Sequence, residues 1–280
     1  MSVLPVDDFR ARRDYLPDDA FALVEEGPDP PFDRIGTPAW RAMFDLSDDV
    51  ALRTTSFQGT IAEHCYDAWS AVIGSFPQDR PEASPMFEAL LDLADHLQSG
   101  SFSALHGYYR QAFGTLRTAV ELMIVTARFS LFEGIDALRA WRYDAASALH
   151  IRPVTDLDRL ASHTAIQKLN SAMGERVLAK GTGRQREGWV WDVFQRLSKF
   201  THVTPGYTDG DLWRSNGPVW VPTAFAMYVV MMREVLAIAA LLARVADPEL
   251  ELGAELLALL TFEGEDWVPF MRRGLRSLGV

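Results

Sequence analysis

Two basic residues and a histidine near the end of one amphipathic segment have the types and spacing to handle a phosphodiester. Arg196, Lys199 and His202 lie on the polar face of a helix expected over 187–202. Arg196 and His202 point about 120° apart on a straight helix. They converge on one phosphate if His202 turns at the frayed helix end, where Thr-Pro-Gly at 204–206 stops the helix, or across a twofold dimer. A cap that closes the helix is the alternative role for His202.

A second polar stripe runs along the apolar segment 105–129. Its members follow one another at steps of 4, 7, 4 and 7 residues, which places them on one narrow face of a helix: His106, Arg110, Arg117, Glu121 and Arg128. Gly114 lies inside the stripe and would admit another backbone or a ligand. Three arginines facing one carboxylate leave positive charge for an anion such as a phosphate. The alternative is an Arg117–Glu121 ion pair that fastens a neighbouring helix.

Two further segments could contact RNA. Four basic residues surround Gly-Thr-Gly at 181–183, namely Arg176, Lys180, Arg184 and Arg186. They form either a local basic patch or a solvated loop. The loop from Tyr207 to Trp220 is rich in aromatic residues, which suit base stacking, a protein interface, or packing back on the core.

The elements that must position these residues are helices. The apolar pattern predicts an all-α, multi-helix bundle, with any short strand confined to 203–221. We expect one domain over 46–280, preceded by a proline-rich arm over 1–45 that packs on it. The expected helices are near 48–74, 84–99, 102–133, 135–149, 155–180, 187–202, 222–246, 249–262 and 265–277.

Composition narrows the class of protein. The 280-residue chain is 48% hydrophobic and carries a formal net charge of −11, so any contact with RNA must come from a local basic patch. Its one cysteine, Cys65, fits a reducing compartment. No apolar stretch of signal-peptide length opens the chain, and we interpret 223–246 as a buried core helix. We therefore expect a cytoplasmic protein with no membrane association.

No arrangement of residues predicts a metal or a cofactor. Glu63, His64 and Cys65 are consecutive, and consecutive positions on a helix point about 100° apart. Asp92 and His96 are four residues apart, but no matching pair accompanies them.

The two polar helices together carry a resemblance to a known family. Arg196, five intervening residues and His202 resemble the Arg–four to six residues–His signature of HEPN ribonucleases. The sequence Leu-Ser-Lys-Phe-Thr-His at 197–202 is also similar to HEPN-like bacterial proteins, together with Tyr-Tyr-Arg-Gln-Ala-Phe-Gly-Thr-Leu-Arg-Thr-Ala-Val-Glu at 108–121. The resemblance spans residues 100–245.

The resemblance implies a helical bundle that forms a homodimer and cuts RNA without a metal, often as a toxin or phage-defence component. His202 would then be the general acid or base, Arg196 would stabilise charge on the phosphate, and Lys199 would favour neutral His202 and attract the phosphate. Leu197 follows the motif arginine, where active members usually carry a polar residue. The alternative is therefore a non-catalytic helical module that dimerises and binds a protein or a small anionic ligand.

Overall fold

The computed structural model describes residues 45–75, 84, 86–139, 161–201, 218–260 and 265–279. The chain divides into two units, Met1–Leu46 and Ser47–Val280, and the elements below belong to the second, except for Leu46 at the start of the first helix. Of the predicted arm, 1–45, all but Asp45 lies outside the described residues, so its packing on the domain stays a prediction.

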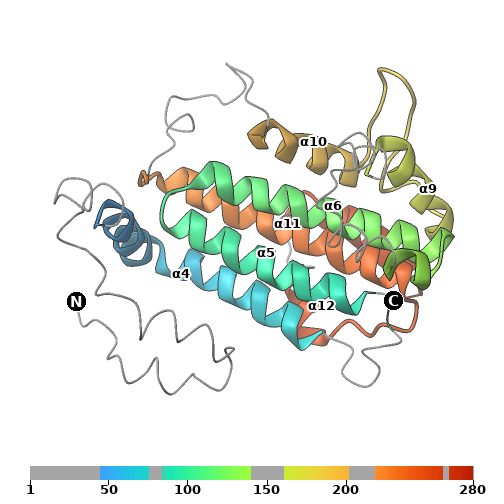
Figure 1. Cartoon of the computed structure of the whole chain (residues 1–280), viewed down its shortest axis with the longest axis horizontal. Coiled ribbons are helices and arrows are strands. Elements are labelled where there is room, and N and C mark those ends of the chain that lie inside the picture. Colours follow the sequence, from blue (N-terminus) through green and yellow to red (C-terminus); the bar gives the residue numbers. More distant parts are fainter. Residues whose placement is uncertain are drawn as a thin grey trace, which may run out of the picture. The chain divides into compact units, whose positions relative to one another are not determined.

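The described part of the chain is all-α, as the sequence predicts (Figure 1). A single pair of bridged residues, Lys180 and Glu187, is the one β-type pairing among the described residues, and it lies outside the predicted interval 203–221. The named helices are α4 (Leu46–Gly74), α5 (Phe87–Leu105), α6 (Tyr109–Phe132), α9 (His163–Met173), α10 (Trp189–Thr201), α11 (Pro222–Ala246), α12 (Ala254–Leu260) and α13 (Val268–Ser277).

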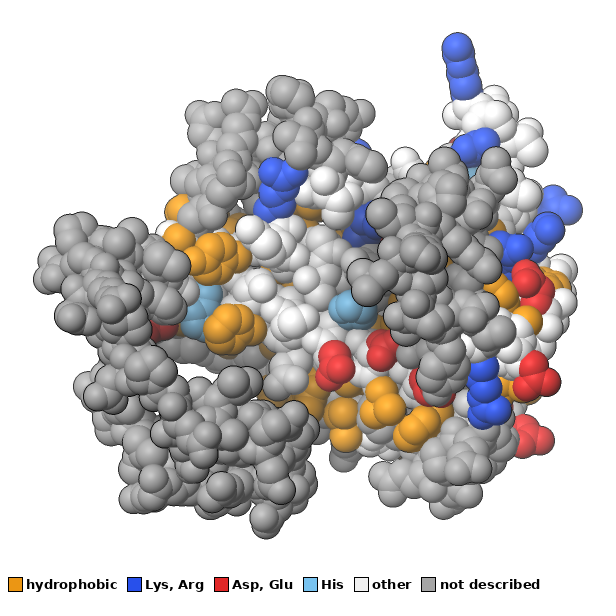
Figure 2. Space-filling view, viewed as in Figure 1, with side chains coloured by type: hydrophobic (Ala, Val, Ile, Leu, Met, Phe, Trp, Pro, Cys, Tyr) orange, Lys and Arg blue, Asp and Glu red, His pale blue; other side chains and the backbone are white. Residues whose placement is uncertain are grey.

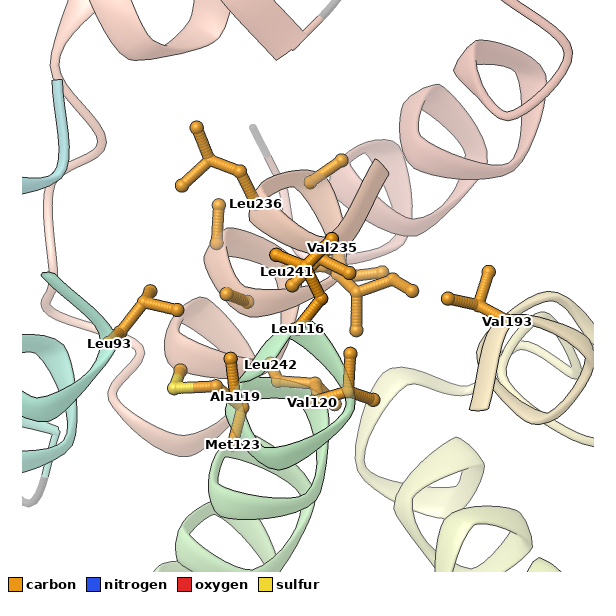
Figure 3. Close-up of a cluster of buried hydrophobic side chains, with 14 of the residues drawn as sticks. Leu93, Leu116, Ala119, Val120, Met123, Val193, Val235, Leu236, Leu241 and Leu242 are labelled. Atoms are coloured by element: carbon orange, nitrogen blue, oxygen red, sulfur yellow. The ribbon is translucent and has the colours of Figure 1, made fainter. Parts of the chain in front are cut away.

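Helices α6 and α11 form the centre of the bundle. Helix α6 packs against α5, α11 and α10, and α11 also packs against α5, α12 and α13. Figure 3 shows side chains from four helices meeting in this core: Leu93 of α5, Leu116, Ala119, Val120 and Met123 of α6, Val193 of α10, and Val235, Leu236, Leu241 and Leu242 of α11. A helix that is apolar nearly all round has to be buried in this way.

Helix α11 is the described helix that is long and apolar enough to cross a membrane. Its most apolar window has a mean hydropathy of 1.9, and 83% of that window is buried inside the fold. Its bounds agree with the predicted 222–246, because Pro222 suits the first helical turn and the Asp-Pro pair at 247–248 stops the helix. This burial is what we predict for a core helix.

The predicted break between the second and third helices is misplaced. Helix α5 continues to Leu105, and the turn 106–108 separates it from α6. Gly107 takes a φ of +81°, and a β-carbon there would overlap the backbone of Val219. Only glycine fits such a turn. His106 therefore precedes α6 and is not part of the helical stripe that the sequence predicts.

The predicted helix 155–180 is shorter in the structure. Helix α9 ends at Met173 with Gly174 as a left-handed C-cap, and the chain then leaves the helix. The Asn170 side chain holds the departing chain, because its Nδ2 donates to the Ala179 carbonyl and its Oδ1 accepts from the Leu178 amide. These backbone groups have no helical partner and would otherwise be buried unpaired.

Candidate functional site

The two predicted polar stripes meet where α10 crosses α6. Arg110 Nε donates to the Phe200 carbonyl at 3.0 Å, and Arg117 Nε donates to Ser198 Oγ at 3.3 Å. Between them, a β-carbon placed on Gly114 would lie 3.7 Å from the Thr201 methyl carbon. We call this contact zone the α6–α10 seam; it comprises Arg110, Gly114, Arg117, Ser198, Phe200 and Thr201.

The apolar face of α10 fixes which of its residues reach the seam. Val190, Val193, Phe194 and Leu197 are buried as the periodicity predicts, and the Phe200 ring stacks on Phe113 with centroids 4.2 Å apart. This packing turns Ser198 towards α6 and leaves Gln195, Arg196 and Lys199 exposed. The seam is therefore a consequence of how α10 buries its apolar face.

Arg117 is neutralised inside the seam. Its Nη1 lies 2.8 Å from Glu121 Oε2, with 19% of the arginine side chain and 17% of the glutamate exposed. The guanidinium carbon also lies 5.1 Å from the centroid of the Phe194 ring, a cation–π distance. The ion pair that the sequence left open as an alternative thus forms within α6, and the Arg117 contacts with Ser198 and Phe194 join α6 to α10.

Arg110 is placed differently. It is half-buried, and its Nε is bonded to a carbonyl in the last turn of α10, the negative end of that helix. With the residues that the structure describes, its two terminal amino groups form no hydrogen bond or ion pair. Arg110 thus has the donor geometry to take a bidentate anion beside the end of α10.

The other two members of the predicted stripe lie away from the seam. Arg128 pairs with Glu133 at 3.2 Å at the far end of α6. His106 Nδ1 lies 2.8 Å from the Phe102 carbonyl oxygen, and its ring stacks on the Phe102 ring with centroids 4.0 Å apart. The structure therefore groups Arg110, Arg117 and Glu121 and leaves His106 and Arg128 out.

Arg196 faces another helix. Its Nη2 lies 2.6 Å from Glu234 Oε2, and the other oxygen of that carboxylate accepts from Trp189 Nε1 at 3.0 Å. Arg196 and Ser198 are two residues apart and so point about 200° apart around α10. The motif arginine is thus held towards α11, on the other flank of α10 from the seam.

Glu234 is the functional-site neighbour that the sequence pattern did not reveal. Its side chain is 8% exposed in the middle of the most apolar helix. A charge in such a run must be paired. A glutamate in an apolar helix therefore indicates from sequence that a partner exists, but it does not identify Arg196, which is 38 residues away.

His202 lies outside the described residues, as do Tyr207 and Trp213. The chain order alone places His202 directly after Thr201, the last residue of α10 and a member of the seam. Trp220 is described, and its ring lies with its centroid 5.3 Å from that of Phe57, a residue of α4 that is 73% exposed. This contact does not decide between the alternatives for the loop.

Among the described side chains, no three His, Cys, Asp or Glu residues form a group that could hold a metal ion. Comparisons of the chain with protein-family models, with characterised proteins and with solved structures found no match. The likeness to HEPN proteins therefore stands on the residues quoted above.

Proposed function

We propose that this chain is a HEPN-like, metal-independent endoribonuclease that acts at the α6–α10 seam as a homodimer, in a toxin or phage-defence role. The observation that carries the proposal is the meeting of the two polar stripes, since Arg110 bonds the Phe200 carbonyl two residues before His202. An arginine and a histidine at one helix end form a site suited to a phosphodiester.

The proposed reaction is attack of the ribose 2′-oxygen on the adjacent phosphorus. The bond from phosphorus to the 5′-oxygen breaks, which leaves a 2′,3′-cyclic phosphate and a 5′-hydroxyl. His202 takes the proton of the 2′-hydroxyl or gives one to the leaving 5′-oxygen, and the second histidine of a twofold dimer does the other step. Arg110 and Lys199 hold the phosphate while its charge grows.

Arg196 takes a positioning role in this proposal. Its Nη2 is bound to Glu234, so it joins α10 to α11. With 49% of its side chain exposed, it still adds positive charge to the outer face of α10.

A non-catalytic module that binds a protein or a small anion is the second candidate. The observation that favours it is that three of the four arginines in the two predicted stripes already have a carboxylate partner: Arg117 with Glu121, Arg128 with Glu133 and Arg196 with Glu234. The net charge of −11 also opposes long-range attraction of RNA.

Cleavage of tRNA and total RNA in EDTA separates the two candidates. We expect the wild type to cut, and His202→Ala to lose about 10²–10⁴-fold of the rate. His64→Ala is the matched control, because His64 lies on α4 with 43% of its side chain exposed. Arg110→Ala should reduce cleavage on the order of tenfold or more, whereas loss of the bond to the Phe200 carbonyl should lower the unfolding free energy by only about 1–2 kcal/mol.

Absence of cleavage by the wild type, or equal cleavage by the wild type and His202→Ala, would reject the nuclease. Binding of inorganic phosphate or an oligonucleotide that disappears in Arg110→Ala would then support the anion-binding module.

A further inference from the structure

The segment between α9 and α10 forms a small basic hairpin, residues 177–188. The Lys180 amide donates to the Glu187 carbonyl at 2.6 Å, and the Glu187 amide donates back to the Lys180 carbonyl at 2.9 Å. The Gln185 amide closes the turn on the Thr182 carbonyl at 3.1 Å. Gly181 has a φ of +79°, and a β-carbon there would overlap the Gln185 carbonyl oxygen. The turn therefore requires glycine at 181.

The base of the basic hairpin is firmly attached to the bundle. Asn170 bonds both Leu178 and Ala179, and His163 Nε2 lies 3.1 Å from the Lys180 carbonyl oxygen. The Trp189 amide adds a bond to the Val177 carbonyl at 3.1 Å. Residues 177–179 and 188 at the base are buried, whereas every residue of the tip, from 180 to 187, is exposed to solvent.

The tip is basic on an acidic molecule. Lys180 pairs with Glu187 at 3.2 Å, whereas Arg184 and Arg186 are exposed and form no ion pair with any described residue. Figure 2 shows Lys and Arg side chains projecting at the upper right, where Figure 1 draws the segment between α9 and α10. Against a net charge of −11, this is a local positive projection.

The basic hairpin leads directly into the helix that ends at the proposed cleavage site. Helix α10 begins at Trp189 and has 13 residues, so its two ends lie about 20 Å apart. Gln195, Arg196 and Lys199 are exposed along it. An RNA strand that touches both the hairpin and the residue after Thr201 would run along this polar face.

We propose that the basic hairpin is a docking site for RNA phosphates, with Arg184 and Arg186 as the contacts, and that it holds a strand along α10 while His202 acts at the other end. The choice of RNA rests on the proposed nuclease function. The hairpin has no aromatic side chain to stack on bases, so it reads the phosphate backbone and not the base sequence.

The test measures RNA affinity without cleavage. His202→Ala protein is titrated against a labelled single-stranded RNA over a range of salt, alone and with Arg184→Glu/Arg186→Glu. We expect the double variant to bind on the order of tenfold more weakly, with a salt slope smaller by about 0.7 for each phosphate that is no longer neutralised. Arg53→Glu/Arg273→Glu is the matched control, because both arginines are exposed on other helices, α4 and α13.

Three results would overturn the docking site. Equal affinity and slope in the double variant and its parent would do so, as would an equal loss of affinity in the control pair or no RNA binding by the parent. Thermal melting of all variants checks that the fold is unchanged. If the wild type fails to cut RNA but the hairpin variant alone loses binding, the docking site stands and the nuclease falls.

Discussion

Replacing Glu234 tests whether Arg196 is held for structure or for catalysis. The Glu234 carboxylate accepts one bond from Trp189 Nε1 and one from Arg196. Trp189 is 4% exposed, so Glu234→Ala leaves its N–H buried without that partner, at a cost of about 1–3 kcal/mol. Arg196 is 49% exposed, so solvent screening limits the value of the ion pair to about 1 kcal/mol or less.

The expected loss of unfolding free energy for Glu234→Ala is therefore about 1–4 kcal/mol, or about 2–16 °C in Tm for a domain of this size. Glu234→Gln keeps an acceptor for Trp189 and should lose only about 1 kcal/mol. A double-mutant cycle with Arg196→Ala should give a coupling below about 1 kcal/mol.

Urea unfolding of the wild type and these variants gives the values, and cleavage in EDTA is measured on the same samples. If Arg196 is a positioning residue, Arg196→Lys restores most of the stability and the cleavage that Arg196→Ala loses. Unfolding free energies of Glu234→Ala and the wild type within about 0.5 kcal/mol of each other would refute the structural argument. Loss of cleavage in Arg196→Ala at unchanged stability would return the catalytic role to Arg196.

Two further predictions concern single positions. Gly181→Ala and Gly183→Ala should each cost about 1–2 kcal/mol because both glycines have a positive φ, and Gly181→Ala adds the overlap with the Gln185 carbonyl. Amide exchange across 178–189 should therefore rise more in Gly181→Ala than in Gly183→Ala, where nothing lies near the added carbon; equal exchange would contradict the overlap. Burial raises the pKa of the Cys65 thiol from 9.0 to about 11. The Cys65 thiol therefore loses its proton at a higher pH in the folded state than in the unfolded state. Its contribution to the unfolding free energy is fully present below pH 9.0 and decreases between pH 9.0 and about 11, by at most about 1.4 kcal/mol per pH unit. Urea unfolding of Cys65→Ala over this range should show a shallower fall than the wild type, and parallel curves would count against it.

The amphipathic and apolar helices could be predicted from the sequence because burial alone dictates them. The segment 187–202 has a clean apolar face, and α10 is observed over Trp189–Thr201 with that face buried. The segment 222–246 is apolar nearly all round and has proline-based stops, so α11 has the predicted bounds. In both cases the pattern of apolar residues and helix stops within the segment is enough to predict the helix.

The breaks between helices could not be predicted in the same way because tertiary contacts decide them. Gly100 looks like a helix end, yet α5 runs through it, since the missing side chain leaves room for the Tyr228 hydroxyl. The true break is at Gly107, where the chain passes the backbone of Val219. Likewise, the predicted helix 155–180 stops at Gly174, and Asn170 holds the chain beyond it by bonding Leu178 and Ala179.

The candidate site was half predictable for the same reason. Each polar stripe is visible in its own segment, and the Arg117–Glu121 pair is local enough to foresee. The bond from Arg110 to Phe200 joins residues 90 positions apart, so the spacing of residues within either segment cannot predict it. The bond from Arg196 to Glu234 is of the same kind.

These long-range bonds change what the Arg-to-His spacing means. Spacing alone treats the arginine and the histidine of a motif as partners, but α10 is held from two flanks by different groups. Glu234 of α11 takes Arg196, while Arg110 and Arg117 of α6 bond the last turn of α10. The turn of α10 that ends at Thr201, directly before His202 in the chain, is bonded by Arg110 and Arg117 and not by Arg196. That is the physical reason for assigning the phosphate to Arg110 and the bracing of α10 to Arg196.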